Sequence, residues 1–160
     1  MTAKDRFWAK VDVRGPSECW LWTATTCSGG RYGSFYTGGG RSHRRRTTAH
    51  RYSFFLAHGW LPEQVDHTDH CNTLCVNPSH LRAATNGQNQ QNLLGAKRSS
   101  KSGVRGVDWH AGNGRWRATV GHLGRQITVG YFDTIDEANA AAVAKRNELF
   151  THNTEDRRAV

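Results

Sequence analysis

Side chains able to bind a metal ion are concentrated in residues 65–81. Zinc prefers thiolate and imidazole ligands in a tetrahedron, and Cys71, Cys75 and His80 can supply three of them from one compact loop. His70 is an alternative to Cys71, because the same spacing separates His70 from Cys75 and Cys75 from His80. The pattern therefore predicts a structural zinc site, with ordinary buried cysteines and a surface histidine as the alternative.

The fourth ligand has to come from outside this loop. We predict Cys19, because it opens a strand-like run and would tie the N-terminal hairpin to the loop, whereas Cys27 lies in a turn rich in Ser and Gly. The chain has four cysteines and no recognisable export signal. Thiols stay reduced in the cytosol, so this composition favours metal binding over disulfides.

Three further sets of residues support a family resemblance. Asp66-His67, the run Cys75-Val76-Asn77-Pro78-Ser79-His80-Leu81 and Asn89 resemble the HNH nuclease motif in its zinc-stabilised form, as in phage-borne and His-Cys box homing endonucleases. Phe7-Trp8-Ala9-Lys10-Val11 and Cys19-Trp20-Leu21-Trp22 are similar to the leader of phage HNH proteins. The resemblance covers roughly residues 7–92, with an extra residue between His67 and the cysteines.

The resemblance implies a ββα-metal fold, also called a His-Me finger, and a catalytic set. His67 on the first strand would accept a proton from water, and Asn89 on the following helix would hold Mg²⁺ or Mn²⁺ together with Asp66. Arg51, or an arginine of the run 44–46, would clamp the phosphate. Taken singly, each of these residues also has an ordinary structural interpretation.

The C-terminal part resembles a second family. Ser102-Gly103-Val104-Arg105-Gly106-Val107, Gly114-Arg115-Trp116-Arg117-Ala118 and Val129-Gly130-Tyr131-Phe132-Asp133-Thr134 are similar to motifs of the APETALA-two/ethylene-response-factor type of DNA-binding domain. The resemblance implies a three-stranded antiparallel sheet laid in the DNA major groove, with one helix on its far side. Asp108 and small polar residues replace basic or aromatic contact residues of that family, so its target sequence does not transfer to this chain.

Period-two alternation separates the two faces of this expected sheet. Trp116, Ala118 and Val120 share the face that suits packing against the Ala-rich helix. The other face is basic and polar, and Arg and Gln side chains can read guanine and adenine edges. The predicted DNA contacts are Arg105 in the first strand, Arg115, Arg117 and Thr119 in the second, and Gln126 and Thr128 in the third. An ordinary solvated sheet face is the alternative.

Local signals predict the elements and domains, all within an α+β class. Apolar spacing with a Gly59 stop predicts a helix over 49–58, and capping-box spacing at Thr134 predicts a helix through Leu149. Strands are expected at 104–109, 115–122 and 126–132. The expected organisation is a nuclease domain at 1–94, a basic linker at 95–102, a DNA-binding domain at 103–153 and a flexible tail at 154–160.

The formal charge of +9 favours a polyanionic partner, and we expect double-stranded DNA. A membrane surface is disfavoured, since the sequence has no basic amphipathic helix, no apolar run of spanning length and no signal peptide. These features, with the phage resemblance, lead us to expect a cytoplasmic, phage-encoded protein in a bacterial host. No heptad or apolar patch indicates a dimer, so monomer and homodimer both stay open.

The sequence thus favours a site-directed DNA endonuclease with a single-metal, histidine-base HNH mechanism, of a homing or nicking kind. The alternative is a zinc-scaffolded DNA-binding protein, either a regulator or a packaging accessory, that does not cleave. An RNA-directed nuclease is disfavoured by the expected DNA-reading sheet.

Overall fold

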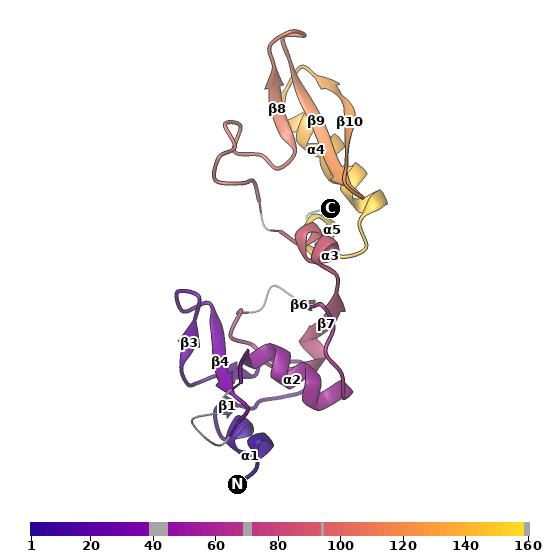
Figure 1. Cartoon of the computed structure of the whole chain (residues 1–160). Helices are drawn as coiled ribbons and strands as arrows, with labels where there is room; N and C mark the ends of the chain where they lie inside the picture. The colour runs from indigo at the N-terminus through magenta and orange to yellow at the C-terminus, as the bar shows by residue number, and fades with distance from the viewer. Residues whose placement is uncertain (39–44, 69–71, 94, 159–160) are drawn as a thin grey trace. The chain divides into compact units, whose positions relative to one another are not determined.

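The computed structural model describes residues 1–38, 45–68, 72–93 and 95–158, and its elements are shown in Figure 1. The chain forms two compact units, residues 1–86 and residues 87–160. The sequence predicts a boundary after residue 94, where the basic, polar composition begins. Helix α3 (Asn86–Gln91) therefore falls almost wholly in the second unit. No helix among the described residues is long and apolar enough to cross a lipid bilayer.

The first unit consists of short elements, and its strands form a three-stranded sheet of order β3-β4-β5 and two antiparallel pairs, β1 with β2 and β6 with β7. In chain order its elements are α1 (Ala3–Trp8), β1 (Val11–Asp12), β2 (Leu21–Trp22), β3 (Thr26–Cys27), β4 (Tyr32–Tyr36), β5 (Arg46–Thr48), α2 (Ala49–His58), β6 (Gln64–His67), the 3-10 helix η1 (Pro78–His80) and β7 (Leu81–Ala84).

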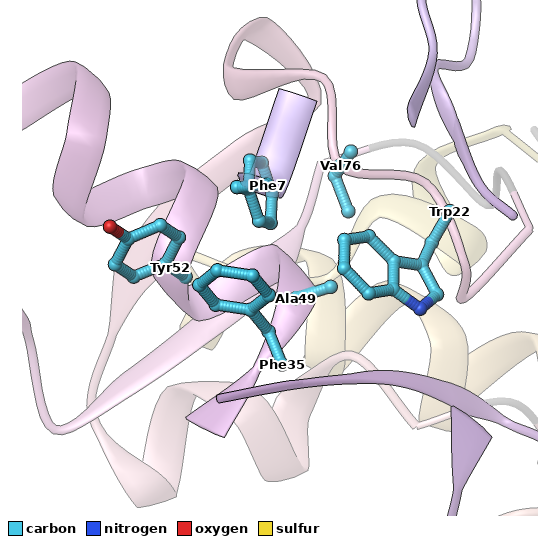
Figure 2. Close-up of a cluster of buried hydrophobic side chains, with 6 residues drawn as sticks. All are labelled: Phe7, Trp22, Phe35, Ala49, Tyr52 and Val76. Atoms are coloured by element: carbon cyan, nitrogen blue, oxygen red, sulfur yellow. The ribbon is translucent and has the colours of Figure 1, made fainter. Parts of the chain in front are cut away.

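An aromatic core joins these elements (Figure 2). Phe7 of α1 is fully buried, and its ring centroid lies 5.3 Å from that of Trp22 and 5.2 Å from that of Phe35. Large aromatic side chains bury much apolar surface per residue, which lets a unit without long helices or strands form a core. The buried cluster consists of Phe7, Trp22, Phe35, Ala49, Tyr52 and Val76.

A second, smaller cluster fixes the β6–β7 hairpin on helix α2. Phe54 of α2 packs with Val65 of β6 and Leu81 of β7, and all three are buried. Helix α2 has the bounds that the sequence predicts, and Gly59 ends it with a φ of 77°, a left-handed conformation that glycine adopts without strain. The hairpin that carries Asp66 and His67 is therefore held by an apolar contact.

The second unit contains an antiparallel sheet of order β10-β9-β8, formed by β8 (Val107–His110), β9 (Arg115–His122) and β10 (Arg125–Phe132). Helix α4 (Ile135–Leu149) begins at Thr134 with the capping box that the sequence predicts. Ala138 and Ala142 of α4 pack on Ala118 of β9, and all three are fully buried. Alanine at these positions allows the helix backbone to approach the sheet closely.

The end of the chain differs from the flexible tail expected at 154–160. Residues Thr154–Arg158 form helix α5, and Asp156 makes an ion pair with the buried Arg146 of α4. Asn153, just before α5, is only 1% exposed and donates to Asn147 Oδ1 at 2.9 Å. Composition alone predicts a frayed tail, because it cannot reveal that a buried arginine on α4 requires a carboxylate partner.

Gly33 of β4 provides a test of the aromatic core. A Cβ atom at this position would lie 2.6 Å from Trp22 ring carbons and 2.7 Å from Ala49 Cβ. We expect Gly33→Ala to lower the free energy of unfolding by about 1–3 kcal/mol, the usual cost of overpacking, in urea titrations followed by tryptophan fluorescence. Gly121→Ala in β9 is the control, since its Cβ would have no atom within 4 Å. Equal stability of Gly33→Ala and the parent would contradict the described packing.

Candidate metal centre and nuclease site

Cys19, Cys75 and His80 lie together in the first unit, and their ligand atoms are all within 4.8 Å of one another. His80 Nδ1 is 3.8 Å from Cys19 Sγ and 3.6 Å from Cys75 Sγ. Two ligands of a tetrahedral zinc ion, one sulfur and one nitrogen, are about 3.6 Å apart, given ordinary zinc–ligand distances. The three side chains therefore fit zinc in both donor chemistry and spacing.

Backbone hydrogen bonds bring the two ligand-bearing segments together. Trp22 N donates to Leu74 O at 3.0 Å, and Val76 N donates to Trp20 O at 2.8 Å. Cys75, between these two contacts, is fully buried and bridges to Leu21 in an antiparallel manner. The run that begins at Cys19 is thus paired with the loop that carries Cys75, which is the tie that the sequence predicts.

Asn77 connects the segment before Cys19 to the turn that contains His80. Its Oδ1 accepts from Ser79 N at 3.0 Å and so caps helix η1 in the turn before Pro78. Its Nδ2 also donates to Pro16 O at 2.9 Å and Glu18 O at 2.7 Å, contacts that the sequence does not predict. Asn77 is 2% exposed, so this amide joins the segment before Cys19 to the turn that ends in His80.

Two predicted ligands remain untested by this geometry. Cys71, with His70 as its alternative, lies outside the described residues, so the choice between them stays a prediction. Cys27 lies in β3 and is not part of the Cys/His cluster found among the described residues.

His67 is the last residue of β6, and its Nε2 lies 3.0 Å from the carbonyl oxygen of Cys75. A carbonyl oxygen can only accept a hydrogen bond, so Nε2 carries the proton. In the neutral ring the basic lone pair is then on Nδ1. The loop that supplies the Cys75 thiol to the metal cluster thus also determines which nitrogen of His67 can accept a proton.

A second histidine lies beside His67. His50 of α2 is 7% exposed, its ring centroid is 5.4 Å from that of His67, and its Nε2 is 3.4 Å from Thr48 Oγ1. Within the described part of the chain, His50 Nδ1 is buried without a hydrogen-bond partner. Burial, and then the charges of His67 and Arg51, lower the pKa of His50 to about 3. His50 is therefore neutral near pH 7.

The two predicted oxygen ligands of a divalent ion are in different units. Asp66 is 9% exposed and accepts from Arg82, its partner across the hairpin, at 3.1 Å from Nε and 2.8 Å from Nη2. Asn89 lies on helix α3, whose residues from Gly87 onward belong to the second unit, whereas the sequence places Asn89 in the same domain as Asp66. The joint role of Asp66 and Asn89 therefore remains a proposal.

The basic residues predicted to clamp phosphate have protein partners. Arg51 donates from Nη1 to Glu63 O at 3.0 Å and from Nη2 to Pro62 O at 3.1 Å, and so fastens α2 to the segment that leads into β6. Arg46 donates from Nε to Ser34 Oγ at 3.0 Å. Arg44 lies outside the described residues. These contacts give Arg51 a structural role that sequence spacing does not reveal.

In the second unit, the sheet face opposite α4 carries charged and aromatic side chains. Arg117 pairs with Asp108 at 2.8 Å, and Arg115 pairs with Asp133 at 3.0 Å. The rings of His110 and Tyr131 meet edge to face with centroids 5.2 Å apart. Gln126 and Thr128 are exposed on β10. We call this surface the open sheet face; it comprises Asp108, His110, Arg115, Arg117, Gln126, Thr128 and Tyr131.

Two further predicted DNA contacts, Thr119 and Arg105, have hydrogen-bond partners within the protein. Thr119 is only 7% exposed, because the loop before β8 covers it. Its hydroxyl lies 3.4 Å from Gly106 O and accepts from Gln126 Nε2 at 3.2 Å. Arg105 precedes β8 instead of lying in the first strand, and its guanidinium donates to the carbonyl of Leu93 at 2.8 Å. Both residues contact or belong to the segment 102–106, which packs on the sheet at Gly106, where a Cβ would lie 2.4 Å from Thr119 O. Their role in DNA binding stays a prediction.

The metal cluster predicts a specific response to loss of one thiol. We expect the purified protein to contain about one tightly bound zinc ion, which Cys75→Ser removes together with much of the thermal stability of the first unit. Cys27→Ser, outside the cluster, is the matched control and should keep the zinc. Elemental analysis and thermal unfolding measure both outcomes. A Cys75→Ser variant that retained the parent's zinc content would exclude the proposed ligand set.

His50 predicts a component of acid sensitivity. Its pKa is about 3 in the folded chain against 6.5 in the unfolded chain, so the unfolded state binds the proton more readily. The stability that its neutral form contributes is complete above pH 6.5 and is lost as the pH falls towards 3, by at most about 1.4 kcal/mol per pH unit. His50→Phe should flatten the dependence of unfolding free energy on pH in that window, and His58→Phe at an exposed position should not. Equal slopes for parent and His50→Phe would refute the assignment.

Comparison with known proteins gives one family match. Residues 47–91 match the family model described as HNH endonuclease, a segment that includes α2, the β6–β7 hairpin, His67 and Asn89. The match covers less than half of the sequence and does not reach residues 103–153. The searches of curated proteins and of solved structures give no match. At the level of the family, this segment therefore indicates a nuclease.

Proposed function

We propose that the protein is a DNA endonuclease that hydrolyses phosphodiester bonds, with His67 as general base and a divalent ion, Mg²⁺ or Mn²⁺, as the second catalytic component. The observation that supports this most strongly is the His67 Nε2 contact with Cys75 O, within a hairpin that lies in the segment matched to the HNH endonuclease family.

In this proposal His67 Nδ1 removes the proton from the attacking water. The hydrogen bond from Nε2 to Cys75 O directs the lone pair to Nδ1, and it also stabilises the imidazolium that forms when the proton is taken. The neighbouring ring of His50 is neutral, since burial keeps its pKa near 3. His67 can therefore become positively charged without a second cationic imidazole beside it.

The two kinds of metal have different tasks. Zinc at Cys19, Cys75 and His80 would be structural, because it fixes the loop whose carbonyl orients His67. A hard divalent ion would neutralise charge on the scissile phosphate and the leaving oxygen. We assign Asp66 and Asn89 to this ion on the strength of the sequence resemblance. Arg82 would have to share or release Asp66 when the ion binds.

The part of the chain after residue 102, which we call the C-terminal module, is proposed to bind double-stranded DNA through the open sheet face. Arg115, Arg117, Gln126 and Thr128 are the predicted contacts that lie there, and the net charge of +9 favours a phosphate backbone as partner. One HNH centre cuts one strand at a time, so we expect nicks first. The resemblance of residues 7–92 to HNH nucleases also suggests a role as a homing or nicking enzyme.

Cleavage of supercoiled plasmid tests the proposal. With Mg²⁺ the parent should produce nicked circles, and His67→Ala should lower the rate by about 100-fold or more, the usual contribution of a positioned general base. His58→Ala, at an exposed position of α2, is the matched control and should cleave like the parent.

DNA affinity without added Mg²⁺ or Mn²⁺, measured by fluorescence anisotropy, should be the same for the parent and both variants. Cleavage by His67→Ala at the parent's rate would contradict the general-base assignment. Tight binding by the parent without cleavage under Mg²⁺ or Mn²⁺ would instead support the non-cleaving, zinc-scaffolded DNA-binding protein.

A further inference from the structure

Helix α3, which carries Asn89, ends in a set of carbonyls bound by one arginine. The guanidinium of Arg105 donates to Leu93 O at 2.8 Å, to Gln90 O at 3.1 Å and to Gln91 O at 3.1 Å. The last carbonyls of a helix have no partner inside the helix and carry the negative end of its dipole. Arg105 therefore caps the C-terminal end of α3 from another part of the sequence.

A second set of bonds fixes the same helix to the segment after α4. Gln91 Oε1 accepts from Thr151 N at 3.1 Å and from His152 N at 3.3 Å. Asn92 Oδ1 accepts from Thr154 N at 3.4 Å. The side chains of Gln91 and Asn92 thus accept hydrogen bonds from backbone amides of residues 151–154. These bonds tie α3 to the segment after α4.

The groups that hold α3 are themselves buried or paired. Arg146 is 4% exposed; it donates from Nη1 to Arg105 O at 3.0 Å and from Nη2 to Asp156 Oδ1 at 3.0 Å. The Arg105 guanidinium also lies 5.9 Å from the centre of the Phe150 ring. We call Arg105, Arg146, Asp156 and residues 150–154 the α3 platform, because they join α3 to α4 within one unit.

We propose that the C-terminal module has a second task besides DNA binding, which is to fix α3 and thereby orient Asn89 for the divalent ion. Arg105 and Gln91 are then positioning residues of the nuclease. This inference rests on the proposed function for its catalytic consequence. It changes the role of Arg105 from a DNA contact, as the sequence predicts, to a support of the catalytic helix.

The C-terminal module therefore does more than bind the target DNA, because it also holds the helix that carries Asn89. Separation of the protein near residue 95 would remove the platform from α3, although Asn89 would stay on the N-terminal fragment. A short helix of this kind is marginal in water without tertiary support. The proposal therefore predicts that damage to the platform affects metal use before it affects DNA affinity.

The experiment compares the full-length variants Arg105→Ala and Arg115→Ala. Residues that support a metal ligand typically contribute about 10–100-fold in metal affinity or activity. By analogy, Arg105→Ala, which releases the carbonyls that follow Asn89, should raise the Mg²⁺ concentration for half-maximal cleavage, or lower the maximal rate, by up to about that factor. Its DNA affinity without added Mg²⁺ should stay within about twofold of the parent, whereas Arg115→Ala on the open sheet face should weaken DNA binding and leave the Mg²⁺ dependence unchanged. The opposite pattern for Arg105→Ala, weaker DNA binding with an unchanged Mg²⁺ dependence, would overturn the proposal.

A second pair of variants separates positioning from general damage to the fold. Gln91→Ala removes the acceptor for Thr151 N and His152 N, and it should shift the Mg²⁺ dependence in the same direction as Arg105→Ala. Gln91→Glu replaces the amide oxygen with a carboxylate oxygen that can still accept both bonds, and it should restore the parent's behaviour. Failure of Gln91→Glu to rescue, with normal thermal unfolding of both variants, would contradict the platform.

Hydrogen exchange gives a readout that needs no catalysis. Amides of residues 88–93 should exchange faster in Arg105→Ala than in the parent, by about 10-fold or more if the cap contributes the 1.5 kcal/mol or more usual for hydrogen bonds to a charged group. Unchanged exchange would refute the platform even if the parent cleaves DNA. Faster exchange in a variant whose parent does not cleave would retain the platform and reject the nuclease assignment, so the two failures are distinguishable.

Discussion

The proposed chemistry depends on a single residue, Cys75. Its thiol is 3.6 Å from His80 Nδ1 in the metal cluster, and its carbonyl oxygen accepts the hydrogen bond from His67 Nε2. Its amide donates to Asn72 O at 2.7 Å, and the next residue, Val76, is in the aromatic core. The proposed zinc site, the aromatic core and the tautomer of the proposed general base therefore all depend on the position of one fully buried residue.

This arrangement suits a unit that has little regular structure. Strands of two and three residues form few hydrogen bonds with their neighbours. The aromatic core and the Cys/His cluster must therefore provide the stability that longer helices and strands provide in other proteins. Asn77 contributes in the same way, since one buried amide satisfies the carbonyls of Pro16 and Glu18 and the amide of Ser79. The functional groups are consequently positioned mainly by side chains and loops.

Elements with local signals were predictable from the sequence, whereas partner choice among charged groups was not. Gly59 ends α2 and Thr134 caps α4, as expected, because capping chemistry involves residues three or four positions apart. Grouping of Cys19 with Cys75 and His80 was also predictable, because few residue types bind zinc well. Helix α1 has a capping box at Thr2 and Asp5 but only six residues, too few for the apolar spacing of a helix to show in the sequence. Arg105 caps a helix, Arg51 binds the carbonyl of Pro62 and Arg82 pairs with Asp66. Each acceptor lies 11 to 16 residues away in the sequence, so the tertiary fold decides which acceptor each arginine contacts.

Long-range ¹H–¹⁵N correlation spectra of the zinc-loaded protein, at a pH where the His67 ring is neutral, test the central claim most directly. The account predicts that His67 is the Nε2-protonated tautomer, with the ¹⁵N shift of Nδ1 typical of an unprotonated ring nitrogen, because the Cys75 carbonyl can only accept a hydrogen bond. A proton on Nδ1 of His67 would contradict both the described contact and the assignment of Nδ1 as the atom that accepts the proton from water.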